Sequence, residues 1–119
     1  YRRAVELYRG DFLADFKVID IEAPREHLRQ LYYRAVLAVS RISLNQKQTE
    51  QAIRYAQMGI AKDRCLEEAH RILISAYHQQ GRKELAAKQY QSCRQFLAKD
   101  LGLKISPETE ELWNRLFKV

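Results

Sequence analysis

Glycine and proline are scarce in this chain. Its 119 residues include 4 Gly and 2 Pro, whereas an all-β chain needs such residues at its many turns. A hydrophobic fraction of 46% also argues against a disordered chain. The length suits one domain with one core and leaves no room for a second core. The composition therefore favours a single all-α domain over residues 1–119.

Cysteine and long apolar runs are equally rare. Cys65 and Cys93 lie 28 positions apart without a C-x-x-C motif, which indicates neither a zinc site nor a disulfide framework and favours a reducing cytoplasm. No apolar run is long enough to span a membrane, and the first residues lack the order of a signal peptide. Because the chain starts at Tyr1, inside what reads as a helix, we expect a piece of a longer cytoplasmic protein that has no membrane partner.

Basic residues outnumber acidic ones, but they form no block. Lys and Arg total 21 against 15 Asp and Glu, which gives a formal charge of +6. That charge would suit a nucleic acid or an acidic protein as partner. However, no run of five basic residues occurs, and Arg2-Arg3 and Arg82-Lys83 are only pairs. Solvated helix faces therefore explain the charge better than a dedicated nucleic-acid surface does.

The sequence also lacks a recognisable catalytic or metal-binding pattern. Glu67-x-x-His70 has the spacing of di-iron helical bundles, but no second such motif accompanies it. We therefore predict that His27, His70 and His78 lie on helix surfaces. Cys93 falls on an apolar helix face, where a thiol packs as a small hydrophobe, and no P-loop, G-x-S-x-G or H-E-x-x-H motif occurs. We expect no enzymatic activity, no metal, no cofactor and no small-molecule ligand.

What the chain does contain is apolar residues at helical spacing. Leu73 and Tyr77 lie four apart, Gly81 interrupts the run, and Ala86 and Tyr90 resume it at the same spacing. This pattern predicts a helical hairpin from about Leu66 to Lys99 with its corner at Gly81. It also matches the tetratricopeptide repeat, in which a small Ala lets helices approach and aromatic residues fill the space between them.

A similar hairpin is predicted before it. A long helix from about Pro24 to Leu44 leads into a polar corner at Asn45 to Glu50, and a second helix ends near Lys62. Ala52 precedes Ala86 by 34 positions, which is the tetratricopeptide period. The expected core face of the long helix consists of Leu28, Leu31, Tyr32, Ala35, Val39 and Ile42.

The two ends of the chain complete the expected fold. A short helix should end at Gly10 and continue as an apolar connection, through Asp20, that lies across the helical core. Gly102 should end the second hairpin, and Ser106-Pro107 should cap and begin a terminal helix. The predicted fold is all-α, with tetratricopeptide-like antiparallel hairpins stacked as a short right-handed solenoid and a C-terminal capping helix. The apolar face of that last helix comprises Leu112, Trp113, Leu116 and Phe117.

Several short motifs, in order along the chain, resemble the bacterial transcriptional activator domain of antibiotic-regulatory-type transcriptional regulators. They are Leu7-Tyr8-Arg9-Gly10-Asp11-Phe12-Leu13, Glu68-Ala69-His70-Arg71, Gly81-Arg82, Tyr90-x-x-Cys93-Arg94, and Leu101-Gly102 with Ser106-Pro107-Glu108-Thr109. The resemblance covers nearly the whole chain. Two departures concern local packing: Asp63-Arg64-Cys65-Leu66 replaces the usual Asp-Pro-Leu, and Ile21-Glu22-Ala23 lacks the usual Trp.

The resemblance implies a regulatory module that follows an N-terminal winged-helix DNA-binding domain, which is absent from these residues. Its implied partners are that DNA-binding domain, a second copy or the transcription machinery, and it would touch DNA only through the absent domain. The alternative is a tetratricopeptide-type scaffold or adaptor unrelated to DNA. A winged-helix pattern before Tyr1 in the parent chain would separate the two.

By the resemblance to tetratricopeptide domains, a ligand groove should run along the inner face of the first helix of each hairpin. Several of its residues are basic, so an acidic peptide or helix would be attracted to it. Solvated surface without a ligand explains the same residues equally well. The expected lining is Arg34, Leu37 and Arg41 from the long helix, with Glu68, Arg71, Ser75 and His78 from the second hairpin.

Overall fold

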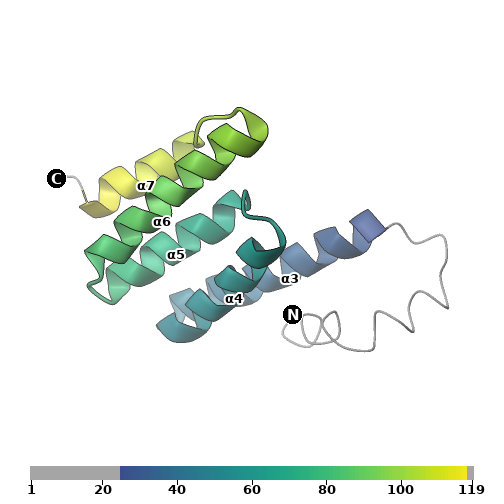
Figure 1. The fold of residues 1–119 in the computed structure, drawn as a ribbon. Coiled ribbons are helices and arrows are strands. Elements are labelled where there is room, and N and C mark those ends of the chain that lie inside the picture. The colour runs from purple at the N-terminus through teal and green to yellow at the C-terminus, as the bar shows by residue number, and fades with distance from the viewer. Residues whose placement is uncertain (1–24, 118–119) are drawn as a thin grey trace.

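The computed structural model describes residues 25–117, and all regular structure within them is helical (Figure 1). The all-α prediction is therefore confirmed. The short helix expected up to Gly10 and the connection through Asp20 lie outside the described residues. The elements are α3 (Arg25–Asn45), α4 (Thr49–Lys62), α5 (Glu67–Gln79), α6 (Lys83–Phe96), the π-helical turn η1 (Leu97–Leu101) and α7 (Pro107–Phe117).

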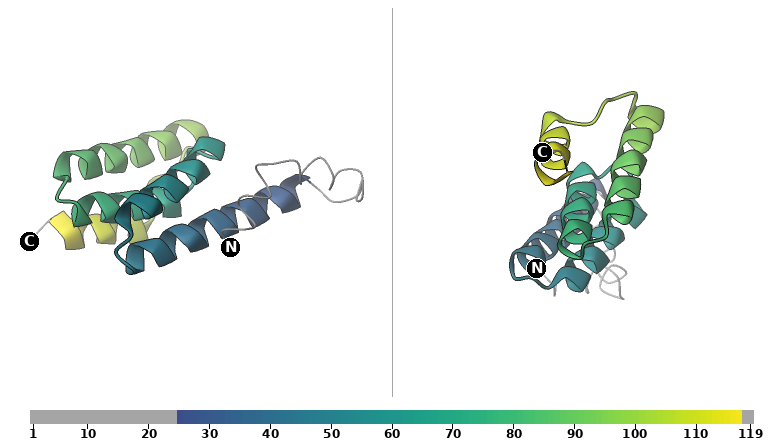
Figure 2. Two further views of the ribbon diagram at one scale, coloured as in Figure 1. Left: turned by 90° about the horizontal axis from the view of Figure 1, so that it is seen from below. Right: turned by 90° about the vertical axis from the view of Figure 1, so that its left-hand side faces the viewer.

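From α3 to α6, each helix packs against the next helix in the sequence. Contacts join α3 to α4, α4 to α5, and α5 to α6, as the views in Figures 1 and 2 show. In addition, α5 contacts both α3 and α7. Thus α5 is the central helix, and it positions the elements on either side of it.

Two glycines end helices as the sequence predicted. Gly81 has a φ of 71° and Gly102 a φ of 65°, the left-handed conformation that glycine adopts most easily. At the first corner, the amide of Arg82 donates to the carbonyl of Tyr77 at 2.8 Å, and at the second the amide of Leu103 donates to Leu97 at 3.1 Å. Both bonds are typical of helix ends capped by a left-handed residue.

Small residues bring α4, α5 and α6 close together. Ala52, Ala69 and Ala86 are fully buried, and Leu73 beside them is 1% exposed. Tyr77 is half-buried and packs against two clusters, one between α4 and α5 and the other between α5, α6 and α7. The predicted use of Ala at the seams and of Leu73 as a core residue is confirmed.

The core face of α3 differs from the prediction in two positions. Leu31 is 45% exposed and Ile42 is 47% exposed, so their assignment to the core was wrong. The buried stripe instead includes Val36 and the small polar residue Ser40. The Ser40 hydroxyl donates to the carbonyl of Ala52 at 2.6 Å, which satisfies this polar group inside the seam.

Candidate functional site

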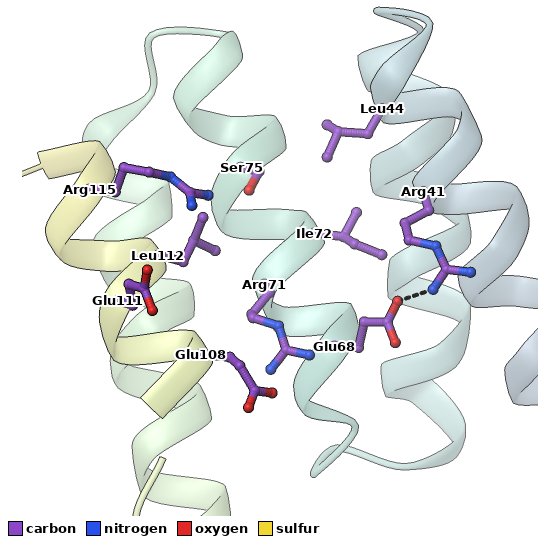
Figure 3. A pocket seen from close by; sticks show the side chains of 10 residues that line it. All are labelled: Arg41, Leu44, Glu68, Arg71, Ile72, Ser75, Glu108, Glu111, Leu112 and Arg115. Atoms are coloured by element: carbon purple, nitrogen blue, oxygen red, sulfur yellow. Dashed lines mark hydrogen bonds and ion pairs between the residues drawn. The ribbon is translucent and has the colours of Figure 1, made fainter. Parts of the chain in front are cut away.

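A groove of about 370 Å³ runs between α3, α5 and α7 (Figure 3). Ile72 and Leu112 are buried at its base, and Leu44 is half-buried at one side. Charged side chains surround this apolar base. The full lining is Arg41, Leu44, Glu68, Arg71, Ile72, Ser75, Glu108, Glu111, Leu112 and Arg115.

The charges of the groove balance. Its lining holds three Arg and three Glu. Arg41 forms an ion pair with Glu68, and Arg115 extends from α7 toward Ser75 (Figure 3). The sequence had indicated a basic groove, whereas the structure adds acidic residues of α7 to it. Net charge alone therefore gives no preference for an acidic ligand.

The carboxylate of Glu67 holds the start of α7 against the start of α5. It accepts hydrogen bonds from the Ser106 amide at 2.8 Å, from the Ser106 hydroxyl at 2.6 Å and from the hydroxyl of Thr109. Thr109 is fully buried and also accepts a bond of 3.1 Å from Arg71. Since α7 forms one wall of the groove, this cluster sets the position of that wall.

These contacts govern the ionisation of Glu67. Burial would raise the pKa of this carboxyl, but hydrogen bonds from Ser106 and Thr109 and the charge of Arg71 outweigh burial, and the pKa is lowered. The glutamate is therefore held as the carboxylate. The predicted capping role of Ser106 is confirmed, because its hydroxyl accepts the amide hydrogen of Thr109 at 3.3 Å.

Comparison with known proteins identifies the family. A family model described as bacterial transcriptional activator domain matches residues 1–117. This chain belongs to the bacterial transcriptional activator domain family. No curated protein and no solved structure matches it significantly. Between residues 25 and 117, none of the activator domain's helices has the length and apolar character that crossing a membrane requires.

The groove of the activator domain contains four of the seven residues expected from the sequence, namely Arg41, Glu68, Arg71 and Ser75. The other three lie elsewhere. Arg34 is exposed outside the lining, and Leu37 packs against the apolar cluster between α4 and α5. The ring of His78 contacts that of Phe117, with centroids 5.2 Å apart.

The sequence reasoning missed the contribution of α7. Glu108, Glu111, Leu112 and Arg115 follow one another at spacings that place them on one helix face. That spacing is visible in the sequence, but it does not indicate which other helix the face meets. The contact between α7 and α5, which brings this face to the groove, includes the hydrogen bonds of Glu67, and no local pattern indicates them.

One histidine of the activator domain occupies an unexpected place. His70 is fully buried, so its assignment to the helix surface was wrong. Gln89 donates to Nδ1 at 2.6 Å, and Nε2 donates to the carbonyl of Arg64 at 2.7 Å. Because both ring nitrogens have partners, the ring can be buried without an orphaned polar atom. Burial lowers the pKa of His70 and favours the neutral ring.

The remaining candidate groups of the domain are structural. Cys93 is 1% exposed, as its apolar face predicted, and burial raises its pKa to about 12. A thiol with such a pKa is a poor nucleophile. Within residues 25–117, no three His, Cys, Asp or Glu side chains gather closely enough to hold a metal ion.

Proposed function

We propose that this domain is the regulatory and protein-interaction module of a cytoplasmic bacterial transcription regulator. It forms a single domain over residues 1–119 and follows an N-terminal DNA-binding domain in the parent chain. In this proposal α3–α4 and α5–α6 are tetratricopeptide-like units of a short right-handed solenoid, which α7 caps. The order of helix contacts and the fully buried Ala52 and Ala86 support this arrangement.

The groove between α3, α5 and α7 is the proposed docking site for a protein segment. The supporting observation is an apolar base, formed by Ile72 and Leu112, between charges of both signs. Glu108, Glu111 and Arg115 form no ion pair within residues 25–117, so they can pair with a ligand.

This arrangement suits a short helix that has one apolar anchor and charges of both signs. The segment would come from the DNA-binding domain, a second copy or the transcription machinery. Such docking would transmit regulation without any chemical step in this domain.

Reversing charge on two walls of the groove tests this role. We expect the double substitution Arg41→Glu and Arg115→Glu to lower promoter activation by the parent regulator at least about tenfold, since it places like charges beside Glu68 and Glu111. Operator affinity should stay within about twofold, because phosphate and base contacts belong to another domain. Reporter transcription and DNA titrations measure the two quantities.

The matched control reverses Arg34 and Arg82, which are exposed and outside the groove lining. This control changes the net charge by the same amount as the groove variant, and it should leave promoter activation within about twofold of the wild-type level. Unchanged activation in the groove variant, a parallel loss of operator affinity, or an equal loss in the control would each contradict the assignment.

A further inference from the structure

A second cleft, of about 640 Å³, opens between α6 and α7 on a different part of the domain. It exists because α7 packs mainly against α5, while η1 and an extended connection carry the chain from α6 to α7 (Figure 2, right-hand view). Tyr90 of α6 stacks on Trp113 of α7, with ring centroids 4.6 Å apart, and joins the two helices at the cleft. None of the residues that line the first groove lines this cleft.

Apolar side chains are exposed at this cleft. Leu103 lines it and is 55% exposed, and Ala98 beside it is exposed as well. Leu101, one residue before Gly102, is also 55% exposed. Removing a leucine side chain from water is favourable, so a ligand that covers this connection gains binding free energy.

The charges of the cleft favour an acidic ligand. Arg94 stands on the α6 wall and Lys104 on the connection, and neither forms an ion pair within residues 25–117. Glu110 is the one acidic residue in the lining. A ligand with two carboxylates can therefore face two cations across an apolar patch.

We propose that the α6–α7 cleft binds an acidic protein segment with an apolar anchor, whose carboxylates face Arg94 and Lys104 and whose anchor covers Leu103. A nucleic acid fits less well, because the Tyr90 ring already stacks on Trp113 and contacts the guanidinium of Arg94, so it is engaged within the domain and not held open for a base. This site lies beyond the proposed groove and does not depend on it.

The test titrates the ¹⁵N-labelled 119-residue chain with a synthetic helical peptide of about 15 residues that carries Glu on one face and Leu on the other. We expect saturable shifts of amides in residues 90–98 and 103–105. A peptide with Lys in place of Glu should bind at least about tenfold more weakly.

Substitutions at the cleft test whether the peptide binds there. The double substitution Arg94→Glu and Lys104→Glu should lower the affinity for the acidic peptide at least about tenfold. Leu103→Ser should lower that affinity about threefold or more. The matched control, Arg82→Glu with Lys83→Glu, reverses two exposed cations at the α5–α6 corner and should change affinity less than about twofold. All of these positions are exposed, and circular dichroism verifies that each variant is folded.

Four results would overturn the proposal. They are the absence of saturable shifts, shifts confined to the first groove, an equal loss of affinity in both double variants, and tighter binding of a DNA duplex of about 20 base pairs than of the peptide at physiological salt. The last result would favour nucleic acid over a protein segment as the ligand. The test of the first groove uses other residues and a transcription readout, so the two proposals can fail separately.

Discussion

Replacing Leu73 with alanine is expected to lower the free energy of unfolding by about 2–5 kcal/mol. The side chain is 1% exposed and belongs to the cluster formed with Ala52, Ala56, Ala69 and Ile72 between α4 and α5. Truncation leaves a cavity that the surrounding helices cannot fill completely. Urea unfolding followed by circular dichroism measures the change.

The control for this substitution is Leu103→Ala, which removes the same atoms from a side chain that is 55% exposed. We expect its cost to stay within about 0.5 kcal/mol, the range for most surface positions. A cost for Leu73→Ala that is as small as the control's would show that the helices do not pack as described.

Replacing Glu67 with alanine is expected to destabilise the domain by about 2–4 kcal/mol, because it leaves the donors of Ser106 and Thr109 without their acceptor. Thr109 is fully buried, so water cannot replace the lost bond without rearrangement of α7. The substitution should also change the fluorescence emission of Trp113, the single tryptophan. This residue lies on α7 and its ring is stacked on Tyr90, so a shift of α7 alters its surroundings. Urea unfolding and fluorescence measure both effects.

The neighbouring acid gives the control. Glu68 pairs with Arg41 at the surface, and the two side chains are 32% and 56% exposed. Such pairs contribute about 0–1 kcal/mol, so Glu68→Ala should have a small effect. If Glu68→Ala and Glu67→Ala were equally destabilising, the hydrogen bonds of Glu67 would not be what holds α7.

The same cluster predicts a dependence on pH. Because hydrogen bonds lower the folded-state pKa of Glu67, its stabilising effect is fully present above the ordinary glutamate pKa of about 4.3 and is lost as the pH falls through the lowered value. Protonated Glu67 resembles Gln in shape and charge. The difference in stability between the wild type and Glu67→Gln should therefore shrink below about pH 4.3, whereas a constant difference would contradict the lowered pKa.

Local chemistry made much of the fold predictable. Gly81 and Gly102 mark helix ends because their left-handed φ suits glycine, and Ser106 marks a helix start because its hydroxyl caps an amide. Spacings of three and four residues then located the helices between these points. These signals depend on a few neighbouring residues, so the sequence displays them directly.

The errors arose where a distant partner decides which way a residue faces. Ser40 can lie in the core because the carbonyl of Ala52 accepts its hydrogen, a contact that the local sequence does not indicate. His70 is buried because Gln89 and the Arg64 carbonyl satisfy its ring. The α7 wall of the groove was missed for the same reason, since its position against α5 involves the hydrogen bonds of Glu67 to Ser106 and Thr109.

We propose that this activator domain works through protein contacts and does not read DNA bases. Fluorescence anisotropy of the 119-residue chain, with an operator duplex and a shuffled duplex at several salt concentrations, tests it most directly. We expect the affinities for the two duplexes to agree within about twofold and to fall steeply as salt rises, because dispersed basic residues with a net charge of +6 can engage only phosphates. An operator preference of about tenfold or more that persists at physiological salt would contradict it.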